Sequence, residues 1–188
     1  MPDSRSTELN HVMVEYMKVR LRSQGYEWTD APHFANDISC SDTIILDSLL
    51  KLSRSLDVDY GSSIAEMVQK AQGKNISDYT AFKTIAEEVF SNEVQWSHFV
   101  TLLVFSSSLA FANGVRDRDV DFISSITEWV TRYFIQSEAV KQFLDSRGGW
   151  TSLINYADAQ HENRYFSLHV LATAALIGLA AAAAYFFK

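Results

Sequence analysis

Four carboxylates between residues 117 and 128 have the spacing of metal ligands. Asp117, Asp119, Asp121 and Glu128 fall at positions 1, 3, 5 and 12 of an EF-hand calcium loop. Position 6 of that loop needs a glycine for its sharp turn, and here it is Phe122. Acidic residues also stabilise the N-terminus of a helix, which explains this cluster better. We therefore expect a helix here and no metal site.

Other catalytic patterns are missing from the sequence. It has no glycine-rich phosphate loop, no HExxH motif and no paired cysteines. Cys40 is the single cysteine, so no disulfide can form within the chain, which fits a reducing compartment. The five histidines have no ligand spacing: His11, His33, His98, His161 and His169. The sequence predicts a binding protein without a cofactor rather than an enzyme.

The charge of the chain disfavours nucleic acid as a partner. The formal net charge is −7, and residues 1–164 hold 15 basic and 23 acidic residues, a balance of −8. Such a domain gains nothing from approaching phosphates, whereas a cationic helix is electrostatically favoured. The polar N-terminus, MPDSRSTELN, is not a signal peptide.

Apolar periodicity predicts an all-α fold. Only 7 glycines and 2 prolines occur in 188 residues, which leaves long stretches free to be helical. Segment 94–112 is apolar on nearly every side, so we expect it to be the central buried helix, broken at Asn113-Gly114 and followed by a second long helix as a hairpin. The expected helices are 6–24 with Ser6 or Thr7 as N-cap and Gly25 as C′ residue, 43–57, 62–72, 79–90, 94–112, 117–136, 138–146 and 151–160.

The last residues predict a membrane anchor. From Val170 to Phe187 the chain has eighteen residues without a charge, enough for a helix of about 27 Å that spans the hydrocarbon core. Aromatic residues border this segment, and Arg164 and Lys188 bracket it, as suits the two interfaces. We expect residues 1–164 to be a cytosolic helical domain and 165–188 to be the anchor. The alternative is a core helix, or a segment that occupies a hydrophobic groove.

Three stretches together resemble the Bcl-2 family of apoptosis regulators. VMVEYMKVRLRSQGYEW (12–28) is similar to the fourth homology motif of that family. NEVQWSHFVTLLVFSSSLA (92–110) is similar to the first motif, and RGGWTSLINYA (147–157) to the second. Their order, their spacing and the terminal anchor also match.

The resemblance implies a Bcl-2-like bundle around a central apolar hairpin. Members bind the helical third homology motif (BH3) of pro-apoptotic partners in a hydrophobic groove, and they can form hetero-dimers with one another. The implied membrane is the mitochondrial outer membrane or, alternatively, the endoplasmic reticulum. The implied groove residues are Val89, Phe90, Gln95, Trp96, Ser97, His98, Phe99, Leu102 and Phe105, with Gly148, Gly149 and Trp150 at its end.

The chain departs from the family pattern at two places. The first motif of the family carries Gly-Arg where this chain has Ser97-His98. A neutral histidine cannot form the bidentate bond that arginine makes with an aspartate of the partner, so we expect weaker dependence on that aspartate and tighter binding at low pH. Within the chain's own third motif, Leu56 replaces a small residue before Asp57. We expect that segment to build the groove wall rather than act as an exported ligand.

The resemblance leaves three roles open. A survival protein is favoured by the well-matched N-terminal motif and the degraded third motif. A pore-forming effector would share the bundle, the hairpin and the anchor, so the fold cannot separate the two roles. The third role is a tail-anchored scaffold that has lost helix binding.

Overall fold

Seven α-helices and one π-helical segment make up the part of the chain that the computed structural model describes, which is residues 4–72, 76–91, 93–116 and 119–162. Strands are absent from those residues, as the sequence predicted. The predicted anchor, 165–188, lies outside them. The elements are α1 (Ser4–Ser23), α2 (Cys40–Gln72), α3 (Tyr79–Val89), α4 (Trp96–Leu109), η1 (Ala110–Arg116), α5 (Val120–Gln136), α6 (Glu138–Arg147) and α7 (Ser152–Glu162).

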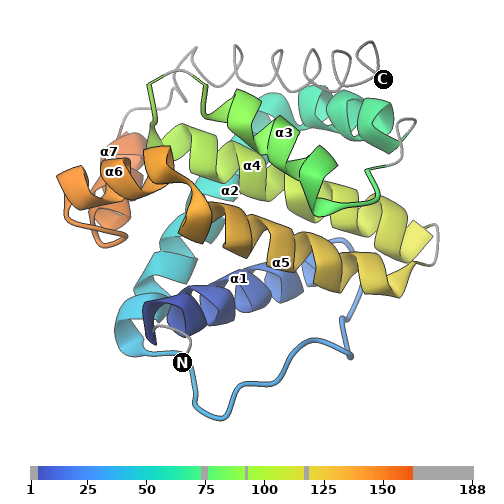
Figure 1. The fold of residues 1–188 in the computed structure, drawn as a ribbon, viewed down its shortest axis with the longest axis horizontal. Helices are drawn as coiled ribbons and strands as arrows, with labels where there is room; N and C mark the ends of the chain where they lie inside the picture. Colours follow the sequence, from blue (N-terminus) through green and yellow to red (C-terminus); the bar gives the residue numbers. More distant parts are fainter. Residues whose placement is uncertain (1–3, 73–75, 92, 117–118, 163–188) are drawn as a thin grey trace.

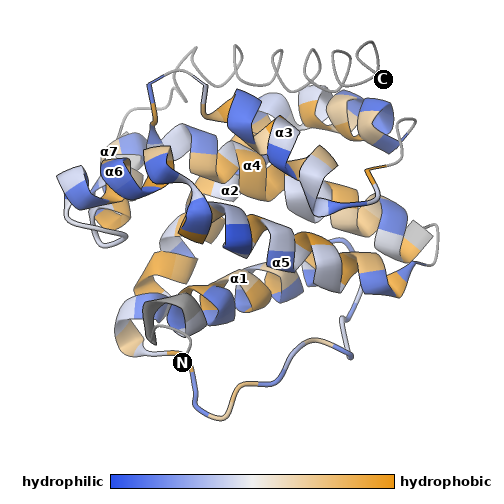
Figure 2. Ribbon diagram, viewed as in Figure 1, coloured by the Kyte–Doolittle hydropathy of each residue, from blue (hydrophilic) through white to orange (hydrophobic). Residues whose placement is uncertain are grey.

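Helix α4 forms the centre of the bundle. All of its residues except Ser108 are buried, because its sequence offers no polar face to water. It packs chiefly against α2 and also contacts α1, α3 and α5. Figure 1 shows α4 crossing the middle of the molecule, with α3 above it and α5 and α1 below. Figure 2 shows hydrophobic residues along much of α4. The predicted buried central helix is confirmed.

Local sequence signals place several helix ends. Ser39 caps the N-terminus of α2, because its Oγ accepts a hydrogen bond from the Asp42 amide at 3.1 Å. Asp78 caps α3 in the same way, through the Ala81 amide at 2.9 Å. Gly25 follows α1 with a φ of 86°, as predicted for a C′ residue. The N-cap prediction for α1 is wrong, because the helix begins at Ser4 and so includes both candidates.

The predicted division of residues 43–72 into two helices is also wrong. Helix α2 runs without a break from Cys40 to Gln72. An internal Gly61 costs a helix about 1 kcal/mol. Apolar side chains buried on both sides of this position, up to Leu56 and again from Ile64, hold the helix together.

The predicted break at Asn113-Gly114 is a change of helix type instead. Helix α4 continues as the π-helix η1, Ala110–Arg116, before the chain turns into α5. A Cβ added to Gly114 would lie 2.4 Å from Ile123 Cγ1 of α5, so only glycine fits this contact. The predicted hairpin is therefore present, and it closes tightly at this end.

Candidate functional site

A cluster of aromatic rings lies where α3, α4, α5 and α6 meet. Phe90, directly after α3, packs edge-on against Phe99 of α4 at 5.0 Å between ring centroids. Its ring lies 5.6 Å from Tyr133 and 6.3 Å from Phe134, both of α5. Such ring pairs contribute about 0.5–1.5 kcal/mol beyond the area that they bury. The cluster thus fixes the end of α3 on the central hairpin.

The predicted groove-end motif joins the same cluster. Trp150 lies 5.5 Å from Trp96 and 5.5 Å from Phe99. The chain reaches this position through Gly148 and Gly149, whose φ values of 83° and 80° are in the left-handed region that favours glycine. The structure therefore brings together the first and second motifs, which are about 50 residues apart in the sequence.

His98 occupies the position that departs from the family pattern, and it is buried in the structure. Its side chain is 4% exposed, and its ring packs edge-on against Phe90 at 5.9 Å. Beside it, Ser97 is also buried and faces the hydroxyl of Tyr156 on α7. Burial raises the pKa of Tyr156, and the nearby Ser97 side chain partly opposes that shift. The Ser97 position therefore serves as a contact between α4 and α7.

The twelve predicted site residues differ in burial. Gln95, Gly149 and Trp150 are half-buried, and Gly148 is exposed. Burial does not itself make or exclude a partner site, but it shows that these side chains contact other parts of the chain. The eight buried residues are Val89, Phe90, Trp96, Ser97, His98, Phe99, Leu102 and Phe105.

A buried polar cluster between α1, α2 and α4 was not predicted. Arg20 of α1 is 7% exposed and makes two bonds to the carboxylate of Asp57 on α2, one of them 3.1 Å long from Nη2 to Oδ1. Its Nε donates to Ser107 Oγ of α4 at 3.2 Å. One turn earlier on α1, Tyr16 Oη pairs with Ser53 Oγ at 2.8 Å. We call these five residues the polar cluster.

The sequence held one signal for this cluster. Tyr16 and Arg20 are four residues apart, and so are Ser53 and Asp57, so each pair lies on one helix face. Two such faces match when the helices pack together. Burial lowers the pKa of Arg20, but Tyr16 and Asp57 more than compensate, so its pKa is raised. The guanidinium therefore stays charged inside the bundle.

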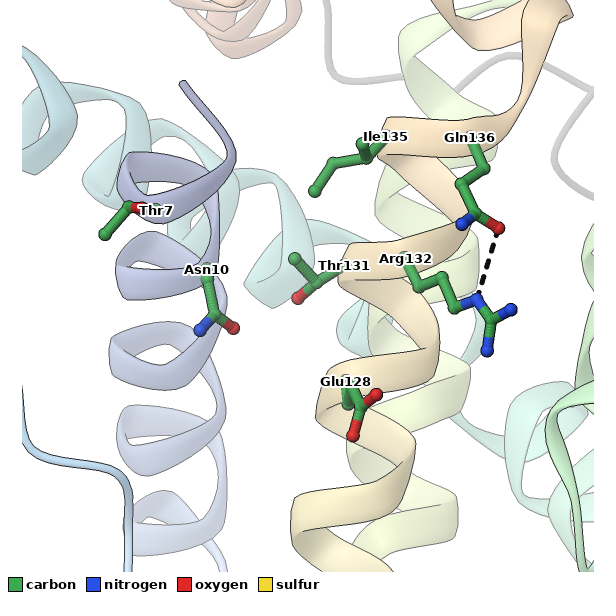
Figure 3. Close-up of a pocket in the computed structure, with 7 residues that line it drawn as sticks. All are labelled: Thr7, Asn10, Glu128, Thr131, Arg132, Ile135 and Gln136. Atoms are coloured by element: carbon green, nitrogen blue, oxygen red, sulfur yellow. Dashed lines mark hydrogen bonds between the residues drawn. The ribbon is translucent and has the colours of Figure 1, made fainter. Parts of the chain in front are cut away.

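A separate hollow of about 430 Å³ lies between α1 and α5. Figure 3 shows side chains of both helices facing it, with Arg132 donating a hydrogen bond to Gln136 at 3.2 Å. Six of its seven lining residues have polar side chains, namely Thr7, Asn10, Glu128, Thr131, Arg132 and Gln136, and the seventh is Ile135. Among the described residues, no three His, Cys, Asp or Glu side chains are grouped to hold a metal ion.

One helix within the described ranges is long and apolar enough to cross a membrane. It comprises Trp96–Val115, and 78% of its most apolar stretch is buried inside the bundle. The core helix of a soluble protein has the same properties, so this feature alone is weak evidence of membrane contact.

Comparisons with known proteins agree on one family. A family model for apoptosis regulator proteins of the Bcl-2 family matches residues 49–150. A search of curated protein sequences finds no match.

Solved structures share the fold at low sequence identity. The crystal structure of Trichoplax adhaerens trBcl-2L2 bound to trBak BH3 has a TM-score of 0.69 at 21% identity, covering 81% of this chain and 99% of that one. Chicken BOK follows with a TM-score of 0.64 at 18% identity, covering 80% of this chain and 95% of its own. Trichuris suis BCL-2 has a TM-score of 0.66 at 21% identity, over 88% of this chain and 100% of its own.

Proposed function

Since this chain belongs to the Bcl-2 family of apoptosis regulator proteins, we propose that it is a survival member. In this role it binds the BH3 helix of pro-apoptotic partners and restrains permeabilisation of the mitochondrial outer membrane. The family resemblance supports a regulator rather than an enzyme. One solved relative of the same fold, trBcl-2L2, is itself bound to a BH3.

The observation that carries the survival role is the placement of the chain's own third motif. An exported ligand helix must turn its apolar stripe towards another protein. Here that stripe faces the core, and Asp57 beside it is paired with Arg20. The buried stripe comprises Ile45, Leu49, Leu52 and Leu56. A segment held in this way supports a receptor of such helices better than a donor of one.

We propose that the partner helix binds over α4, between α2 and α3. Leu102 and Phe105 would accept apolar anchors in the middle of the site, and Phe99 with Trp96 would do so towards its end. Trp150 would then close that end, with its ring already seated against Trp96. Because these anchor residues of α4 are almost fully buried, binding requires the neighbouring helices to move.

We further propose that residues 165–188 hold the chain on a cytosol-facing membrane. Eighteen consecutive uncharged residues support this anchor. Of the two membranes considered, we favour the mitochondrial outer membrane over the endoplasmic reticulum because the partners proposed here act there.

Titration with BH3 peptides tests the binding role. We expect micromolar or tighter binding of at least one peptide from a panel of such helices. A control peptide whose four apolar anchors are replaced by alanine should not bind. Absence of binding across the whole panel would favour the scaffold role instead.

An effector role is the second candidate, and the apolar helix Trp96–Val115 favours it because such a helix could enter a bilayer. Dye release from liposomes separates the two roles. A survival protein should release no dye, with or without an activating BH3 peptide, and should reduce the release caused by an added effector. Dye release by this chain after addition of a BH3 peptide would establish the effector role.

A further inference from the structure

A buried hydroxyl at the junction of α4 and α7 makes no hydrogen bond. Ser97 is 2% exposed, and its Oγ has no partner among the residues that the structure describes. Thr101, one turn later, donates to the Ser97 carbonyl at 2.8 Å, but Ser97 is the second residue of α4 and has no helical turn before it to accept from its own hydroxyl. A buried polar atom without a partner costs folding free energy, so such atoms are few. Ser97 therefore offers a hydrogen bond that the free chain does not use.

The hydroxyl of Tyr156 on α7 lies near this serine. Burial raises the pKa of Tyr156, the Ser97 side chain partly opposes the shift, and no charged group of the described residues is among its causes. Since the ordinary tyrosine pKa is already about 10, the hydroxyl keeps its proton at physiological pH and can donate. His98, the residue after Ser97, packs its ring against Phe90 at 5.9 Å between centroids. The junction therefore presents two neutral donors, and no cation of the described residues acts on Tyr156.

This junction is continuous with the site proposed for the partner helix. Ser97, Thr101 and Phe105 follow one another at intervals of four residues, so they lie along one side of α4. Phe105 is one of the residues proposed to accept an apolar anchor. Trp150, shortly before α7, closes the same end of the site by packing against Trp96 at 5.5 Å between centroids. We therefore expect a polar side chain at this end of the partner helix to reach the two hydroxyls when the neighbouring helices move.

We propose that Ser97 and Tyr156 form a subsite that prefers a neutral acceptor on the partner helix, such as an asparagine amide, over a carboxylate. This inference rests on the proposed function, in which a BH3 helix binds over α4. A carboxylate that enters the junction loses its hydration and meets no cation; its hydrogen bonds are roughly twice as strong as neutral ones, but two of them do not replace the hydration of a buried ion. An amide carries no net charge, and its carbonyl oxygen can accept from both hydroxyls. The chain thus selects partners with asparagine at the position where arginine-bearing members of the family pair with an aspartate.

Calorimetry of the full-length chain with three versions of one BH3 peptide tests this preference. The aspartate of the peptide is kept, replaced by asparagine or replaced by alanine, and the titrations are made at pH 8, above the ordinary histidine pKa of about 6.5. We expect the asparagine peptide to bind at least about five-fold more tightly than the aspartate peptide. Equal binding of these two, or tighter binding of the aspartate peptide, overturns the subsite alone. A chain that binds none of the three peptides contradicts the proposed function and the subsite together.

Variants of the chain assign the preference to the two hydroxyls. Ser97→Ala and Tyr156→Phe each remove one donor, so each should weaken binding of the asparagine peptide about two- to ten-fold and leave binding of the alanine peptide unchanged. Ser106→Ala is the matched control: its Oγ is also buried without a hydrogen bond, but nine residues along α4 place it on the opposite side of the helix, so it should change neither affinity. In urea, Ser97→Ala should not lower the unfolding midpoint, because its hydroxyl makes no bond in the free chain. A lowered midpoint in Ser97→Ala, or an equal loss of affinity for the asparagine and alanine peptides, overturns the assignment.

Discussion

The Arg20–Asp57 ion pair predicts an asymmetry between its two partners. Removing one partner of a buried pair costs about 3–5 kcal/mol, because the other charge stays buried and unpaired. Arg20 is almost fully buried, whereas 39% of the Asp57 side chain is exposed and water partly screens the pair. We therefore expect Asp57→Asn to lower the free energy of unfolding by about 2 kcal/mol.

The opposite change should cost less. Arg20→Met keeps an unbranched apolar side chain, and the carboxylate that it leaves behind is open to water. Ser107 loses its bond from Arg20, but its hydroxyl still donates to the Val104 carbonyl at 3.0 Å. We expect a loss of about 1 kcal/mol for Arg20→Met. The double variant, which combines Arg20→Met with Asp57→Asn, should be no less stable than Arg20→Met alone. In the absence of the arginine, Asp57→Asn leaves no buried charge unpaired.

Urea unfolding of the four proteins provides the measurement. Asp59→Asn, an exposed neighbour on the same helix, is the matched control and should change the free energy by less than about 0.5 kcal/mol. The reasoning is refuted if Arg20→Met costs as much as Asp57→Asn. It is equally refuted if the double variant loses the sum of the two single losses.

Three further predictions concern other parts of the bundle. Burial raises the pKa of Tyr16, so stability should be constant below the ordinary tyrosine pKa of about 10 and fall as pH rises above it. In thermal unfolding, the stability of Tyr16→Phe should fall less steeply at alkaline pH than that of the parent. At pH 7 this variant should be about 1 kcal/mol less stable, because it lacks the hydrogen bond with Ser53. Gly114→Ala should lower the free energy of unfolding by about 1–3 kcal/mol in urea, because its methyl group meets Ile123. A second change, Ile123→Ala, should make room for this methyl group without restoring the stability, because it removes a buried side chain. In calorimetry, replacing the aspartate of a BH3 peptide by alanine should weaken its binding to the parent chain less than three-fold. The same replacement should weaken binding to the His98→Arg variant ten-fold or more.

Each of these outcomes can fail. If stability falls as steeply at alkaline pH in Tyr16→Phe as in the parent, the fall is due to other tyrosines. Tyr133 and Tyr156 also have a pKa raised by burial. A stable Gly114→Ala variant would mean that α5 can shift away from η1. If the parent chain already loses ten-fold with the alanine peptide, His98 is not the residue that relaxes the requirement.

The central helix was predictable because its burial does not depend on which neighbour covers it. A segment such as 94–112 has no polar face, so it must be surrounded on all sides whatever the arrangement of the other helices. Turn signals are equally local, and Gly25 and Gly148 follow their helices with positive φ as the sequence suggested. These predictions needed no knowledge of tertiary contacts.

Two of the wrong predictions underestimated tertiary packing. Gly61-Ser62 and Asn113-Gly114 are unfavourable helix sequences, yet helical structure continues through both. At the first, buried residues on either side hold the helix, and at the second, α5 approaches the glycine closely. The polar cluster was missed for a related reason: whether Arg20 faces Asp57 depends on how α1 is rotated against α2, which the sequence of either helix does not specify.

The predicted site shows why sequence patterns alone confuse a binding groove with a core. Phe99 and Phe105 have the size and apolarity that either role requires, and in this structure both are fully buried. Alanine at either position would cost about 3–5 kcal/mol of stability and would lower binding for that reason alone. Gln95 and Trp150 are half-buried, so substitutions there disturb less of the core. A loss of peptide affinity in Gln95→Ala or Trp150→Phe, with an unchanged unfolding midpoint, therefore identifies the partner site in a way that the buried anchors cannot.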